Sequence, residues 1–302
     1  KHKFLYYFSF HEKNIIINDL KKFYEHWFLK VKSMQKILKK FSLIILIFLT
    51  GCSSTTFVYN RIDFLLPWYL ASYVDLSRDQ KQYLDELLIP FFSWHRHEEL
   101  PRYAEIINSV EEILDSEVKV ENITLITQDV EESWFRLEDE LLLWILPLTK
   151  DLSDEQINNF LQVMQTKTIE SENRYLKRND QVYQKHNYNR LRKNLRRFIG
   201  TMSKEQLDLV KIASKSMRRV DTEWVQNRKK LVANLGSILQ RKEGWEKRFI
   251  SITHRDDLVS KNYRDNYAYN IDITNHLIAA ILNTRTEKQD KKLRAQLKRY
   301  RT

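Results

Sequence analysis

The sequence predicts an all-α protein, an elongated multi-helix bundle with one or two long helices. Three observations favour this class. The 302 residues include only four glycines and four prolines, fewer than sheets joined by tight turns require. Pro147 is the last proline, so the second half of the chain lacks the strongest helix breaker. Apolar residues recur at steps of three and four, the period of an amphipathic helix.

A short apolar segment, Phe41–Leu49, precedes the only cysteine of the chain, Cys52. The segment is too short for a membrane-spanning helix, which needs about 20 residues. Lys36, Lys39 and Lys40 lie just before it. A basic start, an apolar stretch and small residues before a cleavage point form the layout of a secretory signal.

The box Leu49-Thr50-Gly51-Cys52 resembles the signal peptidase II site of bacterial lipoproteins. The resemblance implies cleavage before Cys52 and acylation of its thiol and new amino group. Several acyl chains hold a protein at a membrane, whereas one chain is marginal. Ser53 implies, within this class of signals, export to the outer membrane of a Gram-negative bacterium, facing the periplasm. The alternative is an ordinary signal anchor with an incidental cysteine, and the short apolar segment argues against it.

We expect residues 34–51 to form the signal peptide, because Met34 lies where a signal of usual length begins. Residues 1–33 are rich in Phe, Ile, Lys, Asn and Tyr, whose codons are AT-rich. We interpret them as an upstream extension translated from an over-long gene start. The alternative is an amphipathic extension on a membrane surface. Residues 52–302 are the expected helical periplasmic lipoprotein domain.

One pattern recurs in this domain, as LSRDQ at 76–80, LSDEQ at 152–156 and MSKEQ at 202–206. It predicts a helix start, because the Ser hydroxyl accepts from the third amide of the helix while the Gln side chain reaches back to the Ser amide. The spacings are unequal, which indicates repeated capping chemistry rather than an array of repeats.

The first predicted helices cover 57–74, bent near Pro67, and 78–98, disturbed by Pro90. Pro101 is expected to open a third helix, which ends near Asp115, because Pro is favoured in a first helical turn.

Longer helices are expected to follow. We expect residues 125–146 to form a helix that ends at Pro147. Residues 154–199 form one continuous helix, unless it breaks in its polar middle, QTKTIESENR, and Gly200 closes it. Further helices are expected over 204–240, 245–252 and 257–282 and in the charged tail.

The net charge of +11 raises the question of whether the protein binds nucleic acid. Much of the excess lies in residues 1–51, with ten Lys against three acids. In the rest of the chain, residues 52–172 are strongly acidic and 173–302 strongly basic. We expect acidic and basic helices to pack side by side. The alternative is a basic face exposed to an anionic envelope component, such as lipid phosphates.

The segment SWHRHEELPRY, at 93–103, looks most like a site. The alternative function is a periplasmic enzyme or metal-dependent hydrolase that uses the region of His95, Glu98 and Glu99. His95 and His97, two residues apart, point to different sides of a helix, unlike metal-binding His pairs four apart. We therefore expect no metal.

In the structural interpretation of the same segment, Trp94 packs in the core and Arg96 pairs with the glutamates. Elsewhere, HRDDLVSKN at 254–262 mimics a kinase catalytic loop, but Asn262 lies one position late and no Gly-rich loop accompanies it. No nucleophile elbow or P-loop occurs. The sequence therefore predicts no enzyme and no cofactor.

Three stretches that follow Cys52 carry a family resemblance: FVYNRID, PWYLASYVDLSRDQ and WHRHEELPRY. These stretches resemble an uncharacterised proteobacterial lipoprotein family, domain of unknown function 6279, most closely over 57–103. The resemblance implies an all-helical, lipid-anchored periplasmic protein and no known reaction. The matching positions are Tyr59, Asn60, Asp63, Trp68, Tyr73, Leu76, Gln80, Trp94, Arg96, Glu99, Leu100, Pro101 and Tyr103.

Together these features predict a lipid-anchored envelope lipoprotein that binds or assembles other components without catalysis. The expected partners are the membrane, through the lipid on Cys52, and an envelope protein or anionic lipid. Nucleic acid is not expected as a partner, since it is normally absent from the periplasm.

Overall fold

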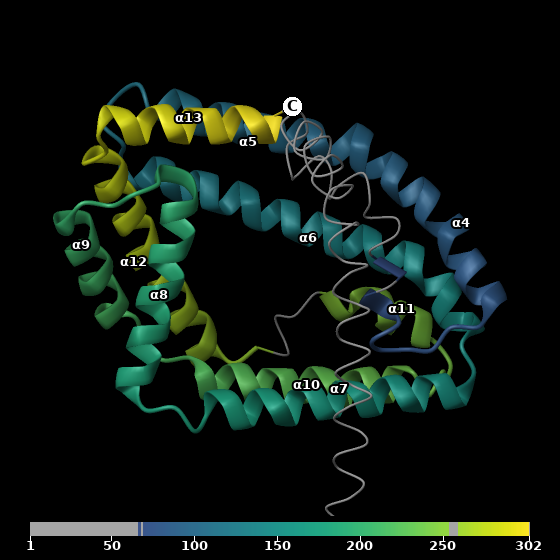
Figure 1. The fold of residues 1–302 in the computed structure, drawn as a ribbon. Helices are drawn as coiled ribbons and strands as arrows, with labels where there is room; N and C mark the ends of the chain where they lie inside the picture. Colours follow the sequence, from purple (N-terminus) through teal and green to yellow (C-terminus); the bar gives the residue numbers. More distant parts are fainter. Residues whose placement is uncertain (1–65, 68, 254–258, 302) are drawn as a thin grey trace, which may run out of the picture. The chain divides into compact units, whose positions relative to one another are not determined.

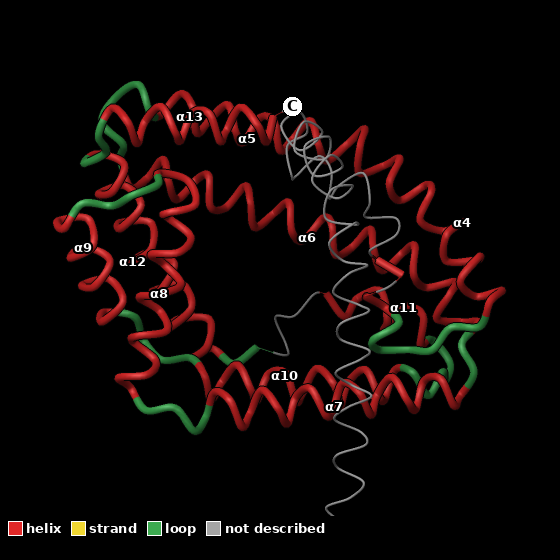
Figure 2. The backbone as a smooth tube through the Cα atoms, viewed as in Figure 1, coloured by secondary structure: helices red, strands yellow, loops and turns green. Residues whose placement is uncertain are grey.

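The computed structural model describes residues 66–67, 69–253 and 259–301 (Figure 1). All described residues belong to one compact unit, which spans 59–302. Figure 2 shows helices joined by loops, and no strand occurs in the described ranges. The prediction of an all-α multi-helix bundle is confirmed. None of these helices is both long and apolar enough to cross a bilayer.

Several expectations fall on residues that the structure does not describe. The predicted helix over 57–74 lies mostly among them. So do the signal peptide, the predicted lipidation site and part of the family pattern, namely Leu49, Thr50, Gly51, Cys52, Tyr59, Asn60, Asp63 and Trp68.

The first long helices follow one another without a loop. α4 (Arg78–Trp94) passes through Pro90 and continues through a π-helical turn, His95–Glu99, into α5 (Leu100–Ile113). The Leu100 amide donates to the His95 carbonyl, five residues back. Pro101 has no N–H with which to continue the α-helical ladder, so the wider turn lies where the ladder is interrupted.

α6 (Val120–Asp151) is the longest of the described helices and passes through Pro147. The prediction that Pro147 ends this helix is therefore wrong. The additional turn buries Leu148 and Thr149. Burial of that turn offsets the hydrogen bond that proline removes.

The prediction of one continuous helix over 154–199 is also wrong. The structure has two helices there, α7 (Asp154–Tyr175) and α8 (Asp180–Ile199). The break lies beyond the polar middle of the segment. Asn179 caps α8 by accepting a hydrogen bond from the Val182 amide at 2.9 Å. Gly200 ends α8 with a positive φ of 83°, as predicted.

The helix predicted over 204–240 divides into α9 (Lys204–Ser216) and α10 (Asp221–Ile238). Asn270 stabilises the break from another helix. Its side chain accepts from the Arg218 amide and donates to the Arg218 carbonyl, each at 2.8 Å. α11 (Trp245–Ile250), α12 (Lys261–Asn283) and α13 (Glu287–Arg301) complete the described chain.

The three predicted capping boxes are confirmed at the starts of α4, α7 and α9. A fourth, which the sequence pattern did not reveal, precedes α13. The Thr286 amide donates to Gln289 Oε1 at 2.9 Å, and the Gln289 amide donates to Thr286 Oγ1 at 3.3 Å. Gln289 also pairs with Gln206 of the α9 box, with amide-to-amide distances of 2.8 and 3.1 Å.

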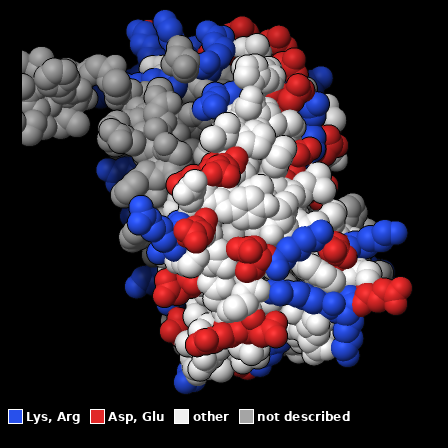
Figure 3. Space-filling model, turned by 90° about the vertical axis from the view of Figure 1, so that its right-hand side faces the viewer, with Lys and Arg blue, Asp and Glu red and all other residues white. Residues whose placement is uncertain are grey.

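Helices distant in sequence lie side by side. α7 packs along α10, α8 along α9, α13 along α5 and α4 along α6, while α12 contacts both α6 and α9. The acidic and basic parts of the chain meet in some of these contacts. Three ion pairs join acidic residues of the first part to basic residues of the second, namely Arg294–Asp115, Arg301–Glu111 and Lys229–Glu172. On the face in Figure 3, acidic and basic side chains are interspersed around an uncharged area.

Candidate functional site

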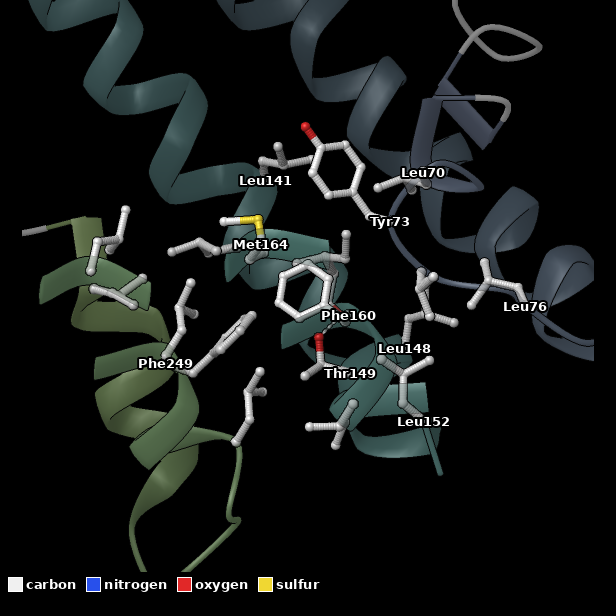
Figure 4. A pocket seen from close by; sticks show the side chains of 18 of the residues that line it. Leu70, Tyr73, Leu76, Leu141, Leu148, Thr149, Leu152, Phe160, Met164 and Phe249 are labelled. Carbon is white, nitrogen blue, oxygen red and sulfur yellow. Dashed lines mark hydrogen bonds between the residues drawn. The ribbon is translucent and has the colours of Figure 1, made fainter. Parts of the chain in front are cut away.

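An apolar cavity of about 560 Å³ lies between α6, α7, α10, α11 and the segment 69–76 that precedes α4. Figure 4 shows side chains from these elements surrounding one space, among them Tyr73, Leu141, Phe160, Met164 and Phe249. The volume falls within the range of about 300–1,000 Å³ that is usual for ligand pockets.

Helical periodicity brings these side chains to one space. On α6 the lining residues Leu141, Ile145 and Leu148 recur at steps of four and three. The lining residues Leu231 and Leu235 of α10 and its C-cap residue, Leu239, recur at steps of four. Steps of three and four keep side chains on one face of a helix. Each of these helices therefore directs an aliphatic face toward the cavity.

The wall holds five polar side chains, those of Tyr69, Tyr73, Glu138, Thr149 and Arg228. The hydroxyls of Tyr69 and Tyr73 lie 3.0 Å apart and share a hydrogen bond. That bond, together with burial, raises the pKa of Tyr69. The Thr149 hydroxyl donates to the Ile145 carbonyl at 3.0 Å. Since these hydroxyls are already paired, the cavity suits a ligand that is mostly apolar.

Two cations lie near the cavity. Arg228 lines it, and its guanidinium stands 5.7 Å from the Trp224 ring centre. The Arg228 Nε is buried and has no acceptor within the described chain. Lys167 Nζ lies 4.6 Å from the Tyr73 ring centre. These groups could receive the acidic end of an apolar ligand.

The segment that the sequence singled out, 93–103, lies at the π-helical turn and does not line this cavity. Glu99 is only 1% exposed. Arg136 on α6 donates to its carboxylate through Nε at 2.7 Å and NH2 at 3.3 Å. The hydrogen bond to Glu99 raises the pKa of Arg136. Glu99 thus fixes α6 against the turn.

The other members of this segment are dispersed. Glu98 and His97 are exposed, and His97 Nδ1 lies 2.7 Å from the Ser93 carbonyl oxygen. His95 packs against the rings of Trp94 and Tyr103, with centroids 6.3 and 5.6 Å away. Burial lowers the pKa of His95. Within the described ranges, no group of three or more His, Cys, Asp or Glu side chains is placed to hold a metal ion.

The structural interpretation of the segment is confirmed in part. Trp94 packs against Phe91, with ring centroids 5.8 Å apart. The predicted pairing of Arg96 with the glutamates is wrong. Arg96 is exposed, while Glu99 faces Arg136 and Arg102. The reason is that the Glu99 carboxylate is buried toward α6, whereas Arg96 points to solvent.

The described family positions mostly support the fold. Gln80 is buried in a capping box, and Tyr103 is half-buried beside His95. Pro101 is exposed in the first turn of α5. Tyr73 and Leu76 do line the cavity. The sequence did not reveal the cavity, because its wall joins helix faces that are far apart in the chain. The apolar spacings, such as that of 141–148, were the local signals.

Comparison with known proteins gives one result. A family model described as a family of unknown function, DUF6279, matches residues 72–264, more than half of the chain. The match includes α4 to α11 and most of the cavity wall. No curated protein and no solved structure matches the chain. The chain belongs to the DUF6279 family.

Proposed function

We propose that this chain is a lipid-anchored protein of the bacterial envelope, and that it binds an acyl chain, free or part of a lipid, in its apolar cavity. The observation that carries the proposal is the cavity itself, about 560 Å³ of space lined mainly by Leu, Ile, Phe and Met side chains. A mostly apolar wall around a space of this volume is typical of small-molecule sites.

The chemistry of the wall favours an acyl chain over a polar ligand. Burial of apolar surface contributes about 25 cal/mol per Å², and a polar ligand would lose its hydrogen bonds to water without replacement here. Arg228, with its unpaired Nε, matches a carboxylate or phosphate at one end of the chain.

The anchor part of the proposal rests on the Leu49-Thr50-Gly51-Cys52 box. Residues 69–73, which follow the expected lipidated Cys52 along the chain, contribute Tyr69, Leu70 and Tyr73 to the cavity wall. A binding protein held at the outer membrane would meet acyl chains at high local concentration.

Acyl-chain binding is tested with a fluorescent fatty acid displaced by palmitate. Leu142 lines the cavity, whereas its neighbour Leu143 points outward and is 47% exposed. Leu142→Trp fills the cavity and should weaken binding about tenfold or more, equivalent to about 1.4 kcal/mol. Leu143→Trp is the matched control and should bind as the wild type does. Thermal unfolding checks that both variants fold.

Failure of palmitate to displace the probe would overturn the proposal. So would a Leu142→Trp variant that folds and binds like the wild type. Equal weakening by Leu143→Trp would place binding on the surface instead.

The anchor is tested separately by Cys52→Ser. We expect the variant to lose incorporation of labelled palmitate and to move from the detergent phase to the aqueous phase. Unchanged processing and partitioning would refute the anchor while leaving the cavity result intact.

A further inference from the structure

A second pocket of about 510 Å³, lined by polar, aromatic and aliphatic side chains, lies between α8, the start of α10 and α12. It shares no lining residue with the apolar cavity. Inferences about the two spaces are therefore independent. Its volume also falls in the range of about 300–1,000 Å³ usual for ligand sites.

Aromatic rings form much of its wall. Tyr263 and Tyr267, one turn apart on α12, are stacked with centroids 6.0 Å apart and an interplanar angle of 14°. Trp224 stands at 81° to the Tyr175 ring at 5.2 Å. Tyr267 is 45% exposed, so a ligand can reach it. The electron-rich faces of such rings attract the slightly positive C–H groups of a saturated ring.

A buried amide in the wall lacks a partner. Asn187 is 3% exposed, and its Nδ2 forms no hydrogen bond with the described chain. An unsatisfied buried donor costs about 1–3 kcal/mol and calls for an explanation. A ligand oxygen that reaches this amide would supply the acceptor.

The charged groups divide into two kinds. Arg178 is held by Asp221 through two hydrogen bonds, and Arg219 also donates to Asp221, at 3.1 Å. These groups build the wall. Arg190, which also lines the pocket, forms no ion pair within the described residues. Burial, with Arg178 and Arg190 nearby, lowers the pKa of His186 and so favours its uncharged form, which can both donate and accept a hydrogen bond.

We propose that this pocket binds an acidic sugar, a pyranose ring that carries a carboxylate. The ring stacks on the tyrosines of α12, its hydroxyls bond to Asn187 and His186, and its carboxylate pairs with Arg190. A guanidinium suits a carboxylate because it donates two parallel hydrogen bonds.

Charge in the pocket favours a single negative charge over a phosphate dianion. Arg178 is neutralised by Asp221, which leaves Arg190 as the cation without a carboxylate partner in the described wall. Glu131 lies close enough to help raise the pKa of Tyr267, after burial. Glu131 would repel a dianion more strongly than a monoanion.

The test is an NMR titration of the full chain with D-glucuronate, D-glucose and glucose 6-phosphate. We expect glucuronate to bind about tenfold more tightly than glucose, the scale of one charge-assisted hydrogen bond. Arg190→Gln should abolish this preference for glucuronate over glucose. Tyr267→Ala should weaken binding of both sugars. Arg196→Gln, an exposed arginine on α8 outside the pocket, is the matched control.

Thermal unfolding of each variant confirms that it folds. Equal binding of glucose and glucuronate, or no binding of either, would overturn the proposal. Tighter binding of glucose 6-phosphate than of glucuronate would make this a phosphate site and also overturn it. A folded Arg190→Gln variant that keeps its preference would do the same.

Discussion

Gln80 and Gln156, the glutamines of two capping boxes, form a reciprocal amide pair. Gln80 Nε2 donates to Gln156 Oε1 at 3.1 Å, and Gln156 Nε2 donates to Gln80 Oε1 at 2.7 Å. Each also donates to a backbone carbonyl beside the partner box, at Asp151 and Asp75 respectively. The starts of α4 and α7 are thereby joined by side chains that also cap them.

Gln80→Ala should destabilise the chain by about 1–3 kcal/mol, because it removes the buried side chain that caps α4 and leaves the half-buried Gln156 amide without its partner. Urea unfolding measures the change. Gln82→Ala is the control, since Gln82 on the same helix is exposed and bonds only to Glu86. We expect its effect to stay within about 0.5 kcal/mol. The double variant Gln80→Ala/Gln156→Ala should show a coupling of about 0.5–3 kcal/mol; strict additivity would contradict the pair.

Arg136→Met should lower the free energy of unfolding more than Gln80→Ala does, because it leaves the buried Glu99 carboxylate without its closest cation. Breaking a buried pair in this way costs about 3–5 kcal/mol. Adding Glu99→Gln to the variant should recover part of the loss. Arg102 also approaches Glu99, at 3.8 Å, but is 48% exposed, so Arg102→Met should cost less than about 1 kcal/mol. Equal losses for the two arginines would refute this assignment.

Two glycines should respond to alanine with opposite signs. Gly200 has a φ of 83°, and a Cβ there would lie 3.0 Å from Lys292 Cδ. Gly200→Ala should destabilise the chain by about 1–3 kcal/mol. Gly236 lies within α10, where a Cβ would meet Leu161 at 3.9 Å. Gly236→Ala should therefore stabilise by about 0.4–1 kcal/mol. Calorimetric melting temperatures that shift in the same direction would contradict this prediction.

Stability should depend on pH through His95. Burial lowers its pKa in the folded chain; Glu99 opposes this shift and Arg96 adds to it. As the pH falls through about 6.5, the unfolded chain takes up a proton that the folded chain resists. The contribution of neutral His95 is thus complete above that pH and is lost as the pH falls through the lowered pKa.

His95→Phe keeps the ring packing and removes this titration. Urea unfolding at pH 7.5 and pH 5 should therefore show a smaller loss of stability for the variant than for the wild type. The pKa of His186 is also lowered, but His186 is present in both proteins and its contribution cancels. An equal loss in the two proteins would show that His95 does not titrate as described.

Local chemistry made the helix starts predictable. Ser77, Ser153 and Ser203 each begin a capping box that needs only neighbouring residues. The break at Asn179 had such a signal too, since Asn before an Asp favours a helix start. The break at Met217–Val220 did not, because Asn270 from α12 holds the Arg218 backbone.

The apolar cavity and the second pocket could not be predicted from the sequence in the same way. The spacing of Leu141, Ile145 and Leu148 shows an apolar face, but not whether the opposing face fills the space beside it. The same limit applies to Asn187, whose burial without a partner depends on elements of α10 and α12. The segment 93–103 attracted attention through its residue types, yet Glu99 is used for packing α6.

The most direct test of acyl-chain binding is photo-cross-linking with a diazirine-labelled palmitate, mapped by mass spectrometry. We expect labelled peptides from 157–164 of α7 and 231–239 of α10, protection by unlabelled palmitate and loss of labelling in Leu142→Trp. Labelling confined to exposed apolar residues such as Val130 and Trp134, without competition by palmitate, would contradict the account.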